Sequence, residues 1–159
     1  DYLHQQIVAG ADTVMIFDSW AGTLPEHEFG RWVTAPTKRL VQKVMHQHPS
    51  IRVIGFPRGA GSNAWDYCKE TQIHCLGCDT AMPLKDMKRL AQDTGLAVQG
   101  NIDPLLLITG GQTLDHRVDE TLEALKDQPH IFNLGHGIVP ETPPENVERL
   151  VHRVRTQAS

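Results

Sequence analysis

The chain has 159 residues, of which 40% are hydrophobic and 21% charged, and its formal net charge is −4. This size suits one compact domain, the composition indicates neither disorder nor a fibre, and the charge gives no basic footprint for nucleic acid. No apolar run approaches the ~20 residues of a membrane span, and residues 1–6 lack the order of a signal peptide. Three cysteines, an odd number, favour the reduced cytoplasm over a disulfide framework. Because the sequence does not begin with Met, we expect a piece of a longer protein.

The first third of the chain alternates between strand and helix patterns. Residues 13–17 (TVMIF) are β-branched and aromatic, which predicts a strand. A helix is expected after Pro25 and should end at Pro36, because proline breaks the interior of a helix. The next helix should bury one apolar face, made of Leu40, Val41, Val44 and Met45. Residues 52–56 (RVIGF) predict the second strand.

The middle of the chain continues this alternation. After a glycine-rich loop at 57–61, a short helix is expected from Ser62. Residues 74–79 (HCLGCD) predict a third strand, and Pro83 should start a helix with an inward apolar face. Residues 96–101 (LAVQGN) predict a fourth strand.

The last third adds one strand between two helices. The first helix should bury Val118, Leu122 and Leu125, and residues 131–135 (IFNLG) predict the fifth strand. Residues 142–145 (TPPE) have the spacing of a capping box with proline at the first helical position. The helix behind them should carry a core stripe, formed by Val147, Leu150, Val151 and Val154.

Five strands, each followed by a helix, predict a parallel sheet, because parallel strands need long crossover connections. Polar residues gather where the strands end, namely Asp18, Ser19, Arg58, Asp79, Thr80, Asn101, Asp103 and His136. In parallel β/α folds the functional groups converge at that edge. A complete eight-unit barrel takes ~250 residues, so residues 1–159 are expected to be the latter part of a single β/α-barrel domain.

Five motifs, in order and across nearly the whole chain, resemble the uroporphyrinogen decarboxylase family. They are residues 17–22 (FDSWAG), 55–61 (GFPRGAG), 77–79 (GCD), 99–104 (QGNIDP) and 132–140 (FNLGHGIVP) with 142–147 (TPPENV). The resemblance implies an α/β fold, a (β/α)8 TIM barrel present here as its last five βα units, strands four to eight. It also implies a cytoplasmic carboxy-lyase of haem and porphyrin biosynthesis, with no membrane or nucleic-acid partner and a homodimer when full length.

The implied reaction is the loss of CO₂ from the four acetate side chains of uroporphyrinogen III, giving coproporphyrinogen III without metal or organic cofactor. Carried over from the family, Ser19 and His136 are expected to contact the substrate. We add Arg58 on chemical grounds, because a guanidinium on a strand-end loop matches a carboxylate. The family's principal catalytic groups lie in its N-terminal part, so this chain alone is expected to be inactive, and no catalytic residue is assigned within it.

Two other interpretations concern ligands. Residues 59–64 (GAGSNA) fit G-x-G-x-x-A between a strand and a helix, which leaves a dinucleotide-binding domain as an alternative. Residues 74–78 (HCLGC) suggest a metal, but Cys75 and Cys78 would point to opposite faces of a strand, so we interpret them as core residues. The related zinc- and cobalamin-dependent methyltransferases use a cysteine near the last strand, where this chain has His136, which favours the decarboxylase.

Two further interpretations concern acid–base groups. Ser19, Asp103 and His136 follow the chain order of an α/β-hydrolase triad, but Ser19 lacks the flanking glycines of a nucleophile elbow. Asp103 and Asp79 each precede a predicted helix, so structural capping is the favoured role for both.

Overall fold

The computed structural model describes residues 1–157, which form two compact units. Unit 1 consists of Asp1–Gly77 with Thr94–Leu96, and unit 2 consists of Cys78–Asp93 with residues 97–157. Within the described residues, none of the helices combines the length and the apolar character needed to cross a membrane.

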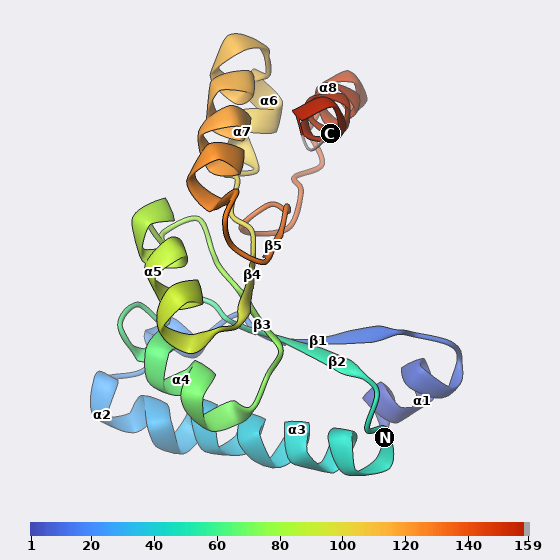
Figure 1. Ribbon diagram of the computed structural model, residues 1–159, viewed down its shortest axis with the longest axis vertical. Helices are drawn as coiled ribbons and strands as arrows, with labels where there is room; N and C mark the ends of the chain where they lie inside the picture. The colour runs from blue at the N-terminus through green and yellow to red at the C-terminus, as the bar shows by residue number, and fades with distance from the viewer. Residues whose placement is uncertain (158–159) are drawn as a thin grey trace. The chain divides into compact units, whose positions relative to one another are not determined.

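Unit 1 is built on parallel strands with helices packed beside them (Figure 1). Its elements are α1 (Tyr2–Val8), β1 (Thr13–Asp18), η1 (Ala21–Thr23), α2 (Glu26–Phe29), η2 (Gly30–Thr34), α3 (Ala35–Gln47), β2 (Arg52–Pro57), α4 (Asn63–Thr71) and β3 (Cys75–Gly77). Strands β1 and β2 pair in parallel from Thr13↔Arg52 to Asp18↔Pro57, and β2 also pairs in parallel with β3. The three strands predicted here are confirmed, although the third is shorter than expected.

Pro36 does not end a helix, and this corrects the prediction. The chain stays helical from α2 through the π-helical segment η2 into α3, where Pro36 occupies the first turn. Proline lacks the N–H that would bond to the preceding turn, and its ring crowds the carbonyl four residues earlier. The wider π turn immediately before it accommodates both effects, so the helix continues.

Unit 2 contains shorter strands and longer helices. Its elements are α5 (Leu84–Thr94), β4 (Ala97–Gln99), α6 (Leu105–Thr109), α7 (Gly111–Leu125), β5 (His130–Ile131) and α8 (Pro144–Gln157). Strands β4 and β5 pair in parallel, and a bridge between Ile102 and Leu134 extends this alignment beyond both strands. All the strand pairs described in the two units are parallel, as the alternation of strand and helix predicted.

The predicted capping box at the start of α8 is not formed. The helix begins at Pro144, and the Thr142 hydroxyl oxygen is buried without a hydrogen-bond partner among the described residues. Because the helix starts at Pro144, Thr142 lies two residues before it and not at the N-cap position that a capping box requires. The first regular contact of this turn runs instead from the Asn146 N–H to the Pro143 carbonyl, at 3.0 Å.

Each unit has a hydrophobic core of its own residues. In unit 1 the buried side chains include Val14, Phe29, Val33, Val41, Val53 and Tyr67. In unit 2 a cluster of Ile102, Leu107, Leu114 and Val118 is fully buried, and it is covered by Val147, Leu150 and Val154 of α8. Val151, which was expected in the α8 stripe, is 39% exposed, so the stripe has three members and not four.

Candidate functional site

In unit 1 the structure places Ser19 and Arg58 on two loops that are tied together by their backbones. Asp18 and Pro57 are the last paired residues of β1 and β2. Beyond them, the Arg58 N–H donates to the Asp18 carbonyl at 3.0 Å, and the Arg58 carbonyl accepts from the Gly22 N–H at 2.8 Å. The side chains of Ser19 and Arg58 are both exposed. These two predicted residues are therefore presented from one rigid edge of the unit.

Glycine is required where these two loops touch. A Cβ atom added to Gly22 would lie 2.4 Å from the carbonyl oxygen of Gly59, well inside any normal contact. Gly59 itself has a φ of +73°, a conformation that other residues rarely adopt. Gly59 thus has a packing role against Gly22, whereas a Cβ atom on Gly61 would have no atom within 4 Å. A packing role for the loop is the interpretation that competed with a dinucleotide fingerprint.

Two large aromatic side chains flank Ser19 and remain open to solvent. Phe17 is 66% exposed and Trp20 is 74% exposed. Phe17 also contacts the buried Phe56 edge to face, with ring centroids 5.9 Å apart. Sequence reasoning used both aromatics as motif residues and did not assign them to the site. Their positions in the sequence could have indicated a role in the site, since Phe17 lies near the end of the strand and Trp20 directly follows Ser19.

In unit 2, His136 follows β5 on a loop that is closely packed on one side. Gly135, the residue before it, donates its N–H to the Ile102 carbonyl at 2.8 Å. A Cβ atom on Gly135 would lie 2.6 Å from the Thr80 nitrogen, so this loop rests directly on the turn after β3. His136 is exposed, and space is open around Gly137. The three predicted substrate-contacting residues are thus divided between the units, with Ser19 and Arg58 in unit 1 and His136 in unit 2.

Asn101 is a buried polar residue at the end of β4 that sequence reasoning did not assign to the site. Its side chain is 2% exposed and its Nδ2 donates to two carbonyl oxygens, that of Asp79 at 2.9 Å and that of Met82 at 2.6 Å. The side chain therefore holds the turn that follows β3. A polar residue at the end of a buried strand was visible in the sequence, but its partners, about twenty positions earlier, were not.

Three strand-end aspartates share one local geometry. Asp18, Asp79 and Asp103 each accept, through Oδ1, the backbone N–H two residues later, at 3.2, 2.8 and 3.0 Å. Asp103 caps the first turn of α6 in this way, as predicted. Asp79 stabilises the tight turn before α5 and does not cap that helix, which starts only at Leu84, so its predicted capping role is corrected. Of the three residues in the triad interpretation, Asp103 and His136 belong to unit 2 and Ser19 to unit 1.

In the predicted third strand, His74 accepts a backbone hydrogen bond and Cys75 and Cys78 lie in the interior. The Val53 N–H donates to Nδ1 of His74 at 3.1 Å, and burial, helped by the charge of Arg52, lowers the pKa of His74. Cys75 and Cys78 are buried, and burial raises the pKa of the Cys75 thiol to about 12. Within residues 1–157, no group of three or more His, Cys, Asp or Glu side chains is arranged to hold a metal ion.

A second half-buried histidine supports the strand end in unit 2. Nε2 of His130 donates to the Gly100 carbonyl at 2.6 Å, because a carbonyl oxygen can only accept. Burial lowers the pKa of His130, and the bond to Gly100 partly opposes this effect. Gly100 is therefore fixed from β5, immediately before the buried Asn101.

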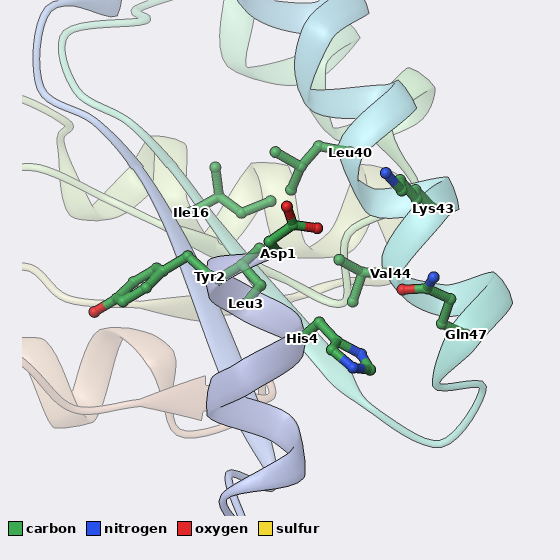
Figure 2. A pocket seen from close by; sticks show the side chains of 9 residues that line it. All are labelled: Asp1, Tyr2, Leu3, His4, Ile16, Leu40, Lys43, Val44 and Gln47. Carbon is green, nitrogen blue, oxygen red and sulfur yellow. The ribbon is translucent and has the colours of Figure 1, made fainter.

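Unit 1 contains a cavity of about 630 Å³ between α1, β1 and α3 (Figure 2). Its apolar side chains are Leu3, Ile16, Leu40 and Val44, and its polar ones are Asp1, His4, Lys43 and Gln47. Tyr2 points away from the other labelled side chains. Neither Ser19 nor Arg58 lines this cavity, so it is separate from the strand-end loops that carry the candidate site.

A family model described as uroporphyrinogen decarboxylase (URO-D) matches residues 1–157. The chain is 51% identical over 156 residues to a uroporphyrinogen decarboxylase of Rhizorhabdus wittichii, covering 98% of this chain and 45% of that protein. It is 49% identical over 155 residues to the enzyme so named from Rhodospirillum rubrum, covering 98% of this chain and 44% of that protein. The chain thus spans less than half the length of these relatives.

Among solved structures, a methyltransferase from Methanosarcina mazei superposes with a TM-score of 0.81. The alignment covers 99% of this chain and 46% of that one, at 22% sequence identity. At this identity the likeness concerns the fold alone. Together with the family match, it confirms the expected β/α-barrel class, of which the chain supplies five strand–helix units.

Proposed function

Because the chain belongs to the uroporphyrinogen decarboxylase family, we propose that it takes part in the stepwise decarboxylation of the four acetate side chains of uroporphyrinogen III, giving coproporphyrinogen III. The observation that carries this proposal is the family match over residues 1–157, together with about half of all residues identical to named decarboxylases. The methyltransferase likeness is one of fold and supports no second function.

In this proposal the strand-end loops of unit 1 bind one part of the substrate. The Arg58 guanidinium offers paired N–H donors that match a carboxylate, and the Ser19 hydroxyl offers a further donor. Phe17 and Trp20, which are 66% and 74% exposed, offer apolar surface for the macrocycle itself. A polycarboxylate with an apolar ring requires both kinds of contact, and this edge of the unit supplies both.

His136 is proposed to bind a carboxylate from unit 2. Its side chain is exposed, and space is open around Gly137, the residue that follows it. In the protonated form the ring would pair with a propionate or acetate group of the substrate. Electrostatic stabilisation of this kind is strongest where the groups are held in place before the substrate arrives.

We propose that the reaction uses no metal and no organic cofactor, as membership of the family implies. The pyrrole ring of the substrate itself accepts the electrons of the departing carboxylate once the ring is protonated. We further propose that turnover needs groups from the part of the decarboxylases that these 159 residues do not match, and that the complete enzyme is a cytoplasmic homodimer. Relatives of which the chain covers 44–45% support the first of these two statements.

The test is an anaerobic incubation of the chain with uroporphyrinogen, followed by oxidation and separation of the products by carboxylate number. The reaction is run with and without a separately produced N-terminal half of a related decarboxylase. We expect products with seven to four carboxylates only in the mixture, and less of them when the chain carries His136→Gln or Arg58→Gln. Lys85→Gln, an exposed charge change on α5, is the matched control and should leave the product pattern unchanged.

Products from the chain alone would contradict the requirement for a complementing half. Absence of product from a mixture shown to assemble would contradict the proposed activity itself.

A further inference from the structure

The turn between β3 and α5 is held by one buried side chain. Asn101 uses Nδ2 for both of its hydrogen bonds, to the carbonyls of Asp79 and Met82. Its Oδ1 is buried and has no partner among the described residues. The contribution of Asn101 to this turn is therefore the donation of two N–H groups to two carbonyl oxygens.

The turn, Asp79–Met82, is short and has hydrogen bonds of its own. Asp79 Oδ1 accepts from the Ala81 N–H at 2.8 Å, and the Asp79 carbonyl accepts from the Met82 N–H at 3.2 Å. Asn101 thus holds both ends of a turn that is already compact. What the side chain determines is the place of this turn relative to the end of β4.

The loop that carries His136 rests on this turn. A Cβ atom on Gly135 would lie 2.6 Å from the Thr80 nitrogen and 2.9 Å from Thr80 Cγ2, which shows how closely the two backbones approach. On its other side, Gly135 donates its N–H to the Ile102 carbonyl at 2.8 Å. Gly135 is therefore confined between the turn that Asn101 holds and the residue that follows Asn101 in the chain.

We propose that Asn101 is a positioning residue for His136. By holding Asp79–Met82 it fixes the surface on which Gly135 lies, and it thereby determines where the imidazole of the next residue is presented. The significance of this placement for carboxylate binding rests on the proposed function, whereas the placement itself does not. Asparagine suits this task because an aspartate would turn carboxylate oxygens toward two carbonyl oxygens, and leucine would offer no donor.

The experiment compares Asn101→Leu and Asn101→Asp with the unchanged 159-residue chain by NMR of the histidine ring carbons and protons. His136→Gln identifies the His136 signals. Asn146→Asp is the matched control, since Asn146 also donates through Nδ2 to two carbonyls, those of Leu107 at 2.7 Å and Ile108 at 3.4 Å, at a different place in unit 2. We expect both Asn101 variants to shift the His136 ring signals and Asn146→Asp to leave them in place.

Gly135→Ala provides a second perturbation, should the Asn101 variants not fold. Its added methyl must displace the Thr80 backbone, so the same His136 signals should move. Unshifted His136 signals in a folded Asn101 variant, or in folded Gly135→Ala, would overturn the proposal.

A binding measurement separates this inference from the proposed function. Uroporphyrin, the oxidised octacarboxylate, is titrated against the unchanged chain and against Asn101→Leu, with fluorescence quenching as the readout. We expect about a tenfold loss of affinity in the variant, the effect of weakening one hydrogen bond to a charged group. Shifted His136 signals, with no binding of uroporphyrin even when the complementing N-terminal half is present, would remove the proposed substrate role and support the positioning role. Full affinity in the variant with unshifted signals would overturn the positioning role alone.

Discussion

The two units present their candidate binding residues by different means. In unit 1, β1 and β2 form a long parallel ladder that ends at Asp18↔Pro57, and backbone bonds at Arg58 continue it into the loops. In unit 2, β4 and β5 contribute only Ala97–Gln99 and His130–Ile131. There the loops after the strands are held by the hydrogen bonds of the Asn101 side chain and by the close packing of Gly135.

This difference determines which substitutions each unit should tolerate. A backbone ladder does not depend on side-chain identity, so the loops of unit 1 should be most sensitive at two glycines. A side chain would intrude at Gly22, and the positive φ of Gly59 is one that other residues rarely adopt. The loops of unit 2 depend on particular side chains and on the core behind them.

Ile102→Ala should produce the largest loss of stability. Ile102 is fully buried in the core of unit 2, and its backbone bonds to Asn133 and Gly135. Removing a buried side chain of this size costs about 2–5 kcal/mol, and Ile102→Val only about 0.5–1.5 kcal/mol. Urea unfolding monitored by far-ultraviolet circular dichroism measures both. Equal losses for the two variants would show that the core does not support the strand ends of unit 2.

Gly22→Ala tests a position in the loops of unit 1 where a side chain would intrude. Its methyl would lie 2.4 Å from the Gly59 carbonyl oxygen, so the two loops must separate. Overpacking of this kind typically costs about 1–3 kcal/mol. Gly30→Ala is the control, because no atom lies within 4 Å of the added methyl and the helical backbone there favours alanine. A loss in thermal stability that is no larger for Gly22→Ala than for Gly30→Ala would contradict the close approach of these loops.

Acidification should break the hydrogen bond between the His74 side chain and the backbone of β2. Burial and the charge of Arg52 lower the pKa of His74 in the folded chain below its unfolded value. The stability that neutral His74 contributes is therefore complete above about pH 6.5 and is lost as the pH falls through the folded pKa. Protonation places a hydrogen on Nδ1, which then cannot accept from Val53. We expect exchange protection of the Val53 amide to fall by up to about tenfold, the value of one hydrogen bond.

His74→Asn is the matched variant for this measurement. The asparagine oxygen can take the place of Nδ1 as an acceptor and does not titrate in this range. Protection of Val53 should then be independent of pH between 7 and 5. A pH dependence that persists in the variant would assign it to another group.

The smallest effect is expected from the ion pairs between α7 and α8. Arg149 pairs with Asp115 through two contacts of 2.8 and 2.6 Å, and Arg153 pairs with Asp119 in the same manner. These hydrogen bonds hold the pKa of both carboxyls below the usual value. Their contribution is thus present above about pH 4 and is lost as the pH falls through the lower folded pKa.

Arg149→Gln should lower the melting temperature slightly at pH 7, less so in high salt, and not at all at pH 2. Lys85→Gln removes an exposed charge elsewhere in the same unit and serves as the control. A difference from the unchanged chain that survives at pH 2 would mean that Arg149 acts through packing.

The sequence predicted those features that depend on local pattern. Residues 13–17 and 52–56 were correctly predicted as strands because short runs rich in β-branched and aromatic residues favour a strand over a helix. Asp103 was interpreted correctly as a cap because its partner lies two residues away. The capping box predicted at Thr142 was wrong although the spacing of residue types was right, since spacing does not show that the helix begins only at Pro144.

The site was predictable only in part for a similar reason. Ser19, Arg58 and His136 were identified by motif and by their place after a strand, and the structure brings the first two together on adjacent loops. Asn101 was not assigned, because its partners Asp79 and Met82 are distant in the chain and no periodic pattern encodes them. Trp20 and Phe17 were not assigned because only the structure shows that they are exposed.

The π-helical segment Gly30–Thr34 has a consequence for how this stretch of sequence tolerates insertions and deletions. Phe29, Val33, Thr37 and Val41 are all buried at intervals of four residues. In a regular α-helix of 3.6 residues per turn, twelve residues from Phe29 to Val41 would drift by roughly 120° around the axis. The wide turn absorbs part of that rotation, so it acts as one additional residue in an otherwise regular helix. Deleting Gly30 should restore regular helical bonding and at the same time rotate Phe29 out of the core, so sequences that lack this residue need a different apolar pattern before Pro36.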